Sequence, residues 1–483
     1  MTAQTILPAN SVTASYDVDN SLRFDGNSDL VFGQSDGSVG EKRTFTVSAW
    51  VKKSKTTGEQ VIIASTPGNE NFFSNLKFNS DDDLHFINYQ SNAGGTNIQL
   101  ITDRKFRDPS AWYHIFLVVD TTQGTAANRV KMFVNGVQET SFSTETYPDQ
   151  NLQTTFNQAS YNYRIGVNND NNGGYFDGYM CEVALVAGVA HAVTDFGQFN
   201  INGIWQPKDI SGLTYEADNS FYLEFKGTST GQNSNGLGAD TSGNGHHFAS
   251  SELAATNQST DTCTNNFATF NAAHATLANA GFSEGNLQFA SDGSASTQNP
   301  ASSSIAVSTG KWYAEFNVVA ESTDSGSFSY VGVAGTATWL SAANNAYYIG
   351  NQADTIAFNG NQAVYSASNE IDSSETNYAN GNIVGVAADF TNSKIYFHVN
   401  GTYINSGDPA GASNGYNIPA TAQSFYYFAV STFGKNATWQ ANFGSPPYAI
   451  SSGNADADGH GNFEYAVPSG YFALCSKNLA EYG

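Results

Sequence analysis

The sequence predicts an all-β fold class, made of two antiparallel β-sandwiches in tandem. A short strand pattern that ends in Asn-Gly occurs twice, as NRVKMFVNG over residues 128–136 and as SKIYFHVNG over residues 393–401. Asn and Gly both tolerate positive φ, so each copy predicts a strand that enters a tight hairpin turn. Each copy follows an apolar strand that ends in Asp, WYHIFLVVD over 112–120 and GNIVGVAAD over 381–389. The copies lie roughly a domain length apart, which predicts two separate domains.

The length and the composition agree with this prediction. A chain of 483 residues is too long for one hydrophobic core, and two or three domains are expected. Phe (33 residues), Tyr (25) and Gly (46) are abundant. Such a mixture suits short strands that are joined by tight turns.

The formal net charge of −24, with only 19 Lys and Arg residues, argues against a nucleic-acid partner, because phosphate binding needs clustered basic side chains. Acidity of this kind favours solubility and mutual repulsion of protein surfaces, and a negatively charged surface also attracts cations. The three cysteines, Cys181, Cys263 and Cys475, lie far apart without CxxC spacing. We expect all three to be reduced and structural.

Residues 1–20 predict an extended N-terminal arm without a core of its own. The arm is either a frayed terminus or a segment that anchors the chain to other proteins. It lacks the charged and apolar regions of a signal peptide, and no later run is long enough to span a bilayer, so we expect no membrane insertion. A composition that resembles extracellular binding proteins, without an export signal, favours a virion protein, which is assembled in the host cytoplasm and released by lysis.

Residues 21–205 predict the first sandwich domain, with strand patterns such as SLRFDG from Ser21 and TFTVSAWV from Thr44. Their order resembles the laminin-G-like, concanavalin-A-like jelly-roll family. The matching landmarks are Phe24–Gly26, Ser48–Val51, Trp112–Asp120, Met132–Gly136 and Phe176–Val183. The resemblance implies an antiparallel jelly roll, and it implies a structural Ca²⁺ near the opening turn and the closing strand, at Asp25 and Asp177.

Residues 206–261 predict a connector by their composition. The stretch Gly231–Gly245 is too polar to build a core, and the connector should contribute little to either domain. Phe221–Phe225 alternates apolar and polar residues and could be a strand that completes either neighbour.

Residues 262–450 predict the second sandwich domain. Its landmarks lie at Gly310–Phe316, Tyr330–Ala334, Gly381–Gly401 and Ala441–Gly444. This order resembles the SPRY family, although that family has an acidic residue where this chain has Asn382. Each domain is expected to have a separate hydrophobic core, with Trp50 and Trp112 in the first core and Trp312 and Phe443 in the second.

Residues 451–483 predict a short C-terminal tail with the pattern GYFALCSKNL. Together with DTSGNGHHF from Asp240, TCTNNFAT from Thr262 and SEGNL from Ser283, the tail resembles structural proteins of phages that infect marine bacteria. The resemblance implies a protein at the surface of the particle, similar to a tail fibre or receptor-binding protein. Such a protein would adhere to host-cell glycans, contact other virion proteins through the N-terminal arm and form a homo-oligomer. A capsid decoration protein with a mainly structural role is the alternative within the virion.

A glycan-degrading enzyme is the alternative from another class. Glu370, Asp372 and Glu375 match the E-x-D-x-x-E spacing of retaining glycosidases that are built on the concanavalin-A-like jelly roll. The flanking residues are Ser, Ala and Asn rather than the aromatic residues that line a sugar cleft, and the motif lies in the half that resembles SPRY proteins. We therefore interpret the triplet as a solvated loop and expect no enzyme activity.

Two loops place short oxygen side chains before Gly, around Asp170 and Asp240, and such loops can wrap Ca²⁺. Both loops lack the bidentate Glu that completes an EF-hand, and Asx-Gly turns are common in turn-rich proteins. With the resemblance, the candidate metal ligands are Asp25, Asp177, Asp170 and Asp240. We expect His114 and His398 to lie on strand surfaces.

Carbohydrate binding needs exposed aromatic faces beside amide and carboxylate groups. The candidate residues in polar loops are Tyr89, Asn92, Tyr161, Tyr163, Tyr347 and Tyr348. The alternative for each tyrosine is a turn residue that caps the edge of a sandwich.

Overall fold

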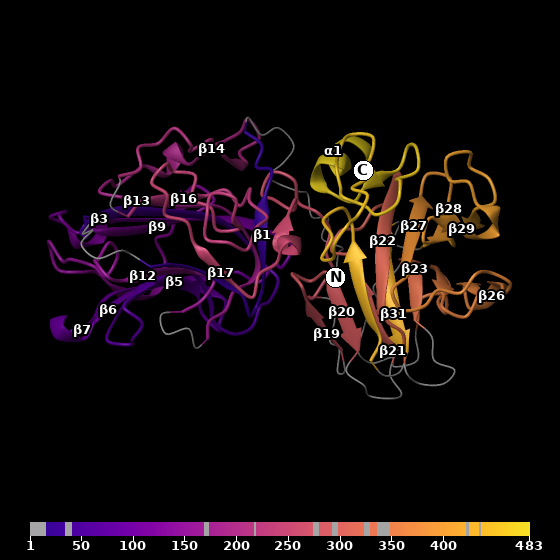
Figure 1. Ribbon diagram of the computed structural model, residues 1–483, viewed down its shortest axis with the longest axis horizontal. Helices are drawn as coiled ribbons and strands as arrows, with labels where there is room; N and C mark the ends of the chain where they lie inside the picture. The colour runs from indigo at the N-terminus through magenta and orange to yellow at the C-terminus, as the bar shows by residue number, and fades with distance from the viewer. Residues whose placement is uncertain are drawn as a thin grey trace. The chain divides into compact units, whose positions relative to one another are not determined.

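The computed structural model describes residues 16–33, 41–168, 173–216, 219–273, 280–291, 298–322, 329–335, 348–421, 425–433 and 436–483. In this part of the chain the backbone is strand, turn and short 3₁₀ helix, with one α-helix, α1 (Ser476–Tyr482). The predicted all-β fold class is therefore confirmed. The chain divides between Asn265 and Asn266 into two compact units, here named the first unit and the second unit (Figure 1).

The first unit contains two antiparallel sheets, sheet A and sheet B, and the hairpin β14 (Gly197–Phe199) and β15 (Trp205–Pro207). Sheet A has the strand order β10-β9-β8-β3-β13-β1-β18, and β16 also pairs with β13. Its strands are β1 (Ser21–Asp25), β3 (Thr44–Lys53), β8 (Trp112–Asp120), β9 (Val130–Val134), β10 (Val137–Gln138), β13 (Asp177–Ala187), β16 (Phe221–Leu223) and β18 (Gln258–Ser259). Sheet B has the order β11-β7-β6-β5-β4-β12-β2-β17. Its strands are β2 (Asp29–Gly33), β4 (Gln60–Thr66), β5 (Phe72–Phe78), β6 (Asp83–Gln90), β7 (Gly95–Lys105), β11 (Phe142–Thr146), β12 (Asn162–Ile165) and β17 (Ala249–Ser251).

The second unit also contains two sheets, sheet C and sheet D. Sheet C has the order β19-β20-β32-β22-β27-β28-β29, with β30 on β28 and the parallel strand β33 on β22. Its strands are β19 (Ala280–Ser283), β20 (Gln288–Ser291), β22 (Lys311–Ala320), β27 (Ile383–Asp389), β28 (Lys394–Val399), β29 (Thr402–Tyr403), β30 (Tyr416–Asn417), β32 (Thr438–Asn442) and β33 (Phe472–Ala473). Sheet D has the order β21-β31-β23-β24-β25-β26. Its strands are β21 (Gln298–Ser302), β23 (Tyr330–Ala334), β24 (Thr355–Asn359), β25 (Val364–Ser366), β26 (Asn369–Asp372) and β31 (Tyr427–Phe433).

Both Asn-Gly turns have the conformation that the sequence predicts. Asn135 (φ 48°) lies in the turn between β9 and β10, Asn400 (φ 49°) lies in the turn between β28 and β29, and the Gly that follows each also has positive φ. Each Asn side chain accepts a hydrogen bond from a backbone N–H of the neighbouring strand, from His114 at 2.7 Å and from Ile383 at 2.9 Å. The two units therefore share one hairpin construction.

The connector belongs to the core of the first unit, which corrects the expectation that it contributes little to either core. Phe221, Leu223, Phe225, Leu237 and Phe248 pack in the hydrophobic cluster between sheets A and B. Strand β16 supplies the first two of these residues and pairs with β13. The prediction was based on the polar composition of the whole segment. A few apolar residues at suitable positions are nevertheless enough to complete a core.

The prediction for the aromatic core residues is confirmed for the second unit and wrong for the first. Trp312 and Phe443 pack in the core of the second unit, as predicted. Trp50 and Trp112 lie instead in a separate cluster with Val18, Trp205 and Cys263. Residues on either side of Trp50 along β3 face the core between the sheets, so the alternation of a strand turns Trp50 to the opposite face, which other segments of the first unit cover.

The segment 451–483 packs partly on the face of sheet C that lies opposite its core, and its Leu474 packs in the core itself. Phe463, Tyr471 and Ala473 form a buried cluster with Tyr313 and Tyr396 of the sheet. The β33 strand of this segment pairs with β22, which fixes its position. The tail is therefore an integral part of the second unit.

Candidate binding pocket

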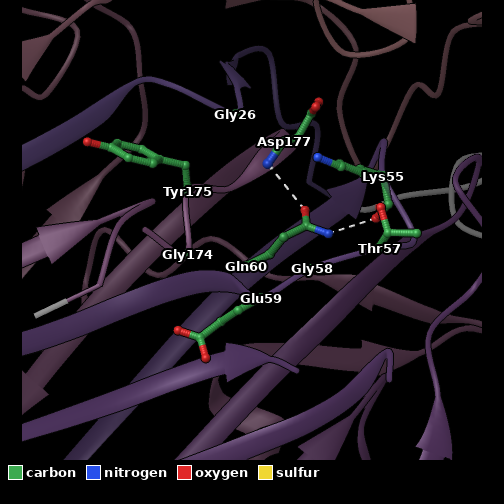
Figure 2. Close-up of a pocket in the computed structure, with 9 residues that line it drawn as sticks. All are labelled: Gly26, Lys55, Thr57, Gly58, Glu59, Gln60, Gly174, Tyr175 and Asp177. Carbon is green, nitrogen blue, oxygen red and sulfur yellow. Dashed lines mark hydrogen bonds between the residues drawn. The ribbon is translucent and has the colours of Figure 1, made fainter. Parts of the chain in front are cut away.

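A polar cavity of about 300 Å³ lies in the first unit (Figure 2). Its lining residues are Gly26, Lys55, Thr57, Gly58, Glu59, Gln60, Gly174, Tyr175 and Asp177. They come from the turn after β1, the loop between β3 and β4, and the segment that leads into β13. Because β1 pairs with β13, and β13 pairs with β3, these three segments meet at one end of the sandwich.

Gln60 holds two of the segments together. Its Nε2 donates a hydrogen bond to the carbonyl of Lys55 at 2.7 Å, and its Oε1 accepts one from the backbone N–H of Asp177 at 3.2 Å (Figure 2). Gln60 is 1% exposed, so solvent does not compete for these hydrogen bonds. The loop between β3 and β4 is therefore fixed against the start of β13.

Two glycines allow the lining segments to approach closely. Gly26 has a φ of 80° and Gly174 a φ of 64°. A Cβ at Gly174 would lie 3.0 Å from Oε1 of Glu59 and from Cγ2 of Val61. Glycine fits both requirements, the positive φ and the close contact.

The pocket presents both donors and acceptors to a ligand. Lys55 and Thr57 are exposed, whereas Glu59, Tyr175 and Asp177 are partly buried. Glu59 forms an ion pair with Lys77 at 2.5 Å, which orients its carboxylate. Such groups can bind the hydroxyls of a sugar, and the Tyr ring offers a flat apolar face. The described lining contains neither His nor Cys, so it presents no nucleophile with a histidine base.

The structure brings together two of the predicted metal ligands. Asp25 and Asp177 are cross-strand partners on β1 and β13, and Asp177 lines the pocket. Oδ1 of Asp25 accepts a hydrogen bond from the backbone N–H of Asn27 at 3.0 Å. Within the described ranges, no group of three His, Cys, Asp or Glu side chains is arranged to hold a metal ion. The pair therefore offers two carboxylates, fewer ligands than Ca²⁺ usually takes from a protein.

The other two predicted metal ligands lie elsewhere. Asp170 falls outside the described residues. Asp240 is 6% exposed, and its carboxylate accepts hydrogen bonds from the backbone N–H groups of Tyr222, Ser242 and His246 and from the Ser242 hydroxyl, all at 2.9 Å. These donors point at both oxygens and give Asp240 a structural role, while its role as a metal ligand stays a prediction. Asp240 stabilises the connector turn against β16.

Three predicted sugar-binding residues lie at the opposite end of sheet B from the pocket. Tyr89 and Asn92 are near the end of β6 and in the following 3₁₀ helix (Ser91–Ala93), and Tyr161 precedes β12. The strand registers place the start of β12 beside the end of β4, whereas the pocket lies at the start of β4. Tyr89 stacks on Phe73 with ring centroids 5.4 Å apart, and Asn92 is exposed.

Tyr163 is not an exposed aromatic residue, which corrects its prediction as a sugar-binding residue. It is 0% exposed in the core of the first unit, and its hydroxyl donates to Oδ1 of Asn157 at 2.6 Å. Alternation along β12 turns its ring toward sheet A. Tyr347 falls outside the described residues, and Tyr348 of the second unit stacks on Tyr330 with ring centroids 4.4 Å apart.

The carboxylate triplet divides into two groups around tyrosines. The Tyr365 hydroxyl donates to Glu370 at 2.6 Å. The Tyr416 hydroxyl lies 2.9 Å from a carboxylate oxygen of Asp372 and 2.9 Å from one of Glu375. Burial and these two carboxylates raise the pKa of Tyr416. Glu370 is exposed, as predicted, but it lies with Asp372 in the edge strand β26 and not in a loop, which corrects that part of the prediction.

Apart from the glycines, sequence reasoning did not identify five residues of the pocket, namely Lys55, Thr57, Glu59, Gln60 and Tyr175. A signal was present in the pattern, because TTGEQ and GGYFDG both combine Gly turns with polar or aromatic side chains. Neither pattern indicates that the two segments meet. Only the pairing of β3 with β13 brings them together.

The two histidines that were expected on strand surfaces are buried, at 0% for His114 and 1% for His398. Burial lowers the pKa of each to about 3. Both face the outer side of their sheets, but other segments cover those sides. They are structural residues of the two units.

Comparison with known proteins supports the fold of the first unit. Residues 24–192 match the family model described as the concanavalin A-like lectin/glucanases superfamily, of the laminin G type. A comparison with curated proteins finds no match. No helix in the described part of the chain is long and apolar enough to cross a membrane.

Several solved structures are similar to parts of the chain. The SPRY domain of human HERC1 is 12% identical, with a TM-score of 0.25, and the match covers 32% of this chain and 87% of that one. A pentraxin from Limulus polyphemus is 16% identical, with a TM-score of 0.29, and the match covers 43% and 96%. Domains LG4-5 of the mouse laminin α1 chain are 12% identical, with a TM-score of 0.28, and the match covers 91% and 92%. These scores are low, and no conclusion about function follows from them. By its family match, the first unit has a laminin-G-type, concanavalin-A-like lectin fold over residues 24–192.

Proposed function

We propose that this chain is a surface protein of a bacteriophage particle, and that its first unit binds a host-cell glycan in the pocket around Asp177. The observation that carries the proposal is a polar pocket with a partly exposed tyrosine on a lectin-like fold. The volume of about 300 Å³ lies at the lower end of the range for small-ligand sites. It suits one sugar residue of a longer glycan.

A pocket of this size gives weak binding at a single site, so adhesion would depend on several copies. Linked sites raise the overall avidity by two or more orders of magnitude without any new contact. We therefore propose a homo-oligomer on the particle, attached to other virion proteins through residues 1–20. Residues 1–15 of this arm fall outside the described part of the chain. The marine-phage sequence resemblance supports the virion location, and a capsid decoration role is the alternative.

The proposal is tested by titrating the full-length protein with oligosaccharides from the host surface polysaccharide. Tyr175→Ala and Asp177→Asn should each weaken binding about tenfold, which corresponds to about 1.4 kcal/mol. Tyr89→Ala is the matched control, because Tyr89 lies at the opposite end of sheet B. Loss of binding in Tyr89→Ala, with normal binding in the two pocket variants, would move the site to that end. Absence of binding to any host glycan would reject adhesion and favour the decoration role.

We also propose that the chain binds glycan without cleaving it. The double variant Glu370→Gln with Glu375→Gln should keep the glycan affinity and the thermal stability of the wild type, since Glu370 is exposed and the amide oxygen introduced at position 375 can still accept the hydrogen bond from Tyr416. Release of reducing sugar is the second measurement. Release by the wild type that the double change abolishes would identify a glycosidase.

A further inference from the structure

Two of the three cysteines lie in contact within the first unit. Sγ of Cys181 lies 3.6 Å from Sγ of Cys263, although 82 residues separate them in the chain. Both are free thiols and at most 1% exposed. We propose that Cys181 and Cys263 form a disulfide in an oxidising environment, and that this disulfide locks the end of the connector onto sheet A.

The chain on both sides of each sulfur is fixed. Cys181 lies in β13 opposite Trp50 of β3. Near Cys263, Asp261 forms a buried ion pair with Lys52 at 2.8 Å and accepts a hydrogen bond from the Trp112 indole at 3.1 Å. A disulfide needs a sulfur–sulfur distance of about 2.0 Å, so the sulfurs must approach by roughly 1.6 Å. Side-chain rotation can supply this movement, while the anchors keep the two residues facing each other.

The residue after Cys263 is also anchored. Oγ1 of Thr264 accepts a hydrogen bond from the backbone N–H of Val18 at 2.9 Å and lies 3.2 Å from the Val18 carbonyl. The segment 261–264 is therefore attached to β3, β8 and the residues before β1. A disulfide to β13 would add a covalent link to the central part of the same sheet.

The chemistry requires an external oxidant, for which we name a low-molecular-weight disulfide such as glutathione disulfide. The thiolate of one cysteine attacks it, forms a mixed disulfide and releases one glutathione thiolate. The thiolate of the other cysteine then attacks the protein sulfur of the mixed disulfide and releases the second glutathione thiolate. The two protons of the cysteines pass to the two glutathione thiolates, and two electrons pass from the protein to the oxidant.

Burial sets the rate of this reaction. Desolvation and the neighbouring Cys181 raise the pKa of the Cys263 thiol, which opposes formation of the thiolate in the closed structure. Oxidation should therefore proceed through local opening of the segment around Cys263 and accelerate in mild urea. After closure, the same burial should protect the disulfide from reductants.

The test uses the full-length protein, incubated with glutathione disulfide or with dithiothreitol in mild urea, then denatured and alkylated. After oxidation, only Cys475 should be alkylated, and peptide mapping should find the Cys181–Cys263 link. The melting temperature of the first unit should rise by about 5–10 °C. Cys181→Ser and Cys263→Ser should each abolish this rise. Because either substitution could impair folding, the mapping of oxidised wild type decides independently. Three alkylated cysteines after oxidation, or stable mixed disulfides at Cys181 or Cys263, would overturn the proposal.

Discussion

His114 shows how the covered face of sheet A fixes a single protonation state. The indole Nε1 of Trp205 donates to Nδ1 of His114 at 3.0 Å, so Nε2 carries the hydrogen and donates to the Ser48 hydroxyl at 2.9 Å. Trp50 and Trp205 stack on the imidazole, with centroids at 4.9 and 5.9 Å. A second proton would break the hydrogen bond from Trp205, in agreement with the lowered pKa.

His398 has an equivalent arrangement in the second unit. The backbone N–H of Gly401 donates to its Nδ1 at 3.1 Å, and Nε2 lies 2.7 Å from the Tyr313 hydroxyl. The Tyr313 hydroxyl lies 3.0 Å from Glu315, whose pKa burial raises to about 7. Gly385 is required beneath the imidazole, because a Cβ there would lie 1.8 Å from Nε2.

Glu182 should make the first unit less stable at high pH. It has a φ of 53° in the irregular part of β13, hydrogen-bonds the Tyr222 hydroxyl, and burial raises its pKa to about 8. The unfolded chain releases this proton near pH 4.5, so the stability contribution is complete below that pH and is lost as the pH rises through about 8. At pH 9, the wild type should have lost up to a few kcal/mol of unfolding free energy that the Glu182→Gln variant retains.

Urea unfolding between pH 5 and 9 measures this effect on the transition of the first unit. The exposed residue Glu216 supplies the matched control, Glu216→Gln, which should follow the wild type. An equal pH slope in Glu182→Gln and the wild type would show that Glu182 is already ionised in the folded protein.

At the scale of structural elements, the attachment of the segment around Asp261 to sheet A depends on one buried ion pair. Lys52 and Asp261 side chains are each 1% exposed, with 2.8 Å between Nζ and Oδ2. Lys52→Met would leave a buried carboxylate and should cost about 3–5 kcal/mol of unfolding free energy. Adding Asp261→Asn should recover part of this loss, because the remaining group is then uncharged.

The pair between Arg43 and Glu41 is the control for this prediction. Its side chains are 40% and 37% exposed, so Arg43→Met should cost much less than Lys52→Met. Urea unfolding of the variants measures each cost. A loss in Lys52→Met as small as that in Arg43→Met would show that water reaches Asp261.

Divalent cations should matter little to the first unit, because Asp25 and Asp177 are only a pair of carboxylates. Chelator should lower its melting temperature by no more than about 4 °C, since a weakly bound ion adds only RT ln(1 + [L]/Kd) to the stability. Differential scanning calorimetry with and without chelator measures the shift. Unfolding at room temperature on chelation would reveal an essential Ca²⁺ site.

For the whole molecule, the boundary between Asn265 and Asn266 predicts which fragments fold alone. Residues 16–265 and 266–483 should each give a cooperative transition, because each contains a complete core. Residues 21–205 should fold poorly, since they lack Phe221, Leu223 and Phe248 of the core. Hydrogen exchange on the three fragments measures the protection. Full protection of residues 21–205 would show that the connector is dispensable. If residues 16–265 lose their protection and regain it only when mixed with residues 266–483, the chain has one continuous fold.

Local patterns determined the secondary structure and the repeated hairpin of this protein. Asn135 and Asn400 were predictable because the φ preference of an Asn-Gly pair is a property of adjacent residues. The all-β class followed from the strand patterns, and the packing of Trp312 with Phe443 followed from the aromatic landmarks of the second domain. The predictions of exposed or isolated residues failed for Tyr163, His114 and the connector, because strand alternation tells which residues share a face but not whether that face is covered.

The sequence by itself determined the fold class, the two Asn-Gly hairpins and the jelly-roll landmarks of this chain, and the family resemblance suggested that Asp25 and Asp177 lie near one site. Only the tertiary structure decided that Trp50 faces away from the main core, that Gln60 joins two segments into a pocket, and that Cys181 meets Cys263. The physical reason is the distance along the chain over which the interactions act. Backbone preferences act between adjacent residues, whereas a pocket and a thiol pair depend on which strands pair across the chain, and that is fixed by burial summed over the whole unit.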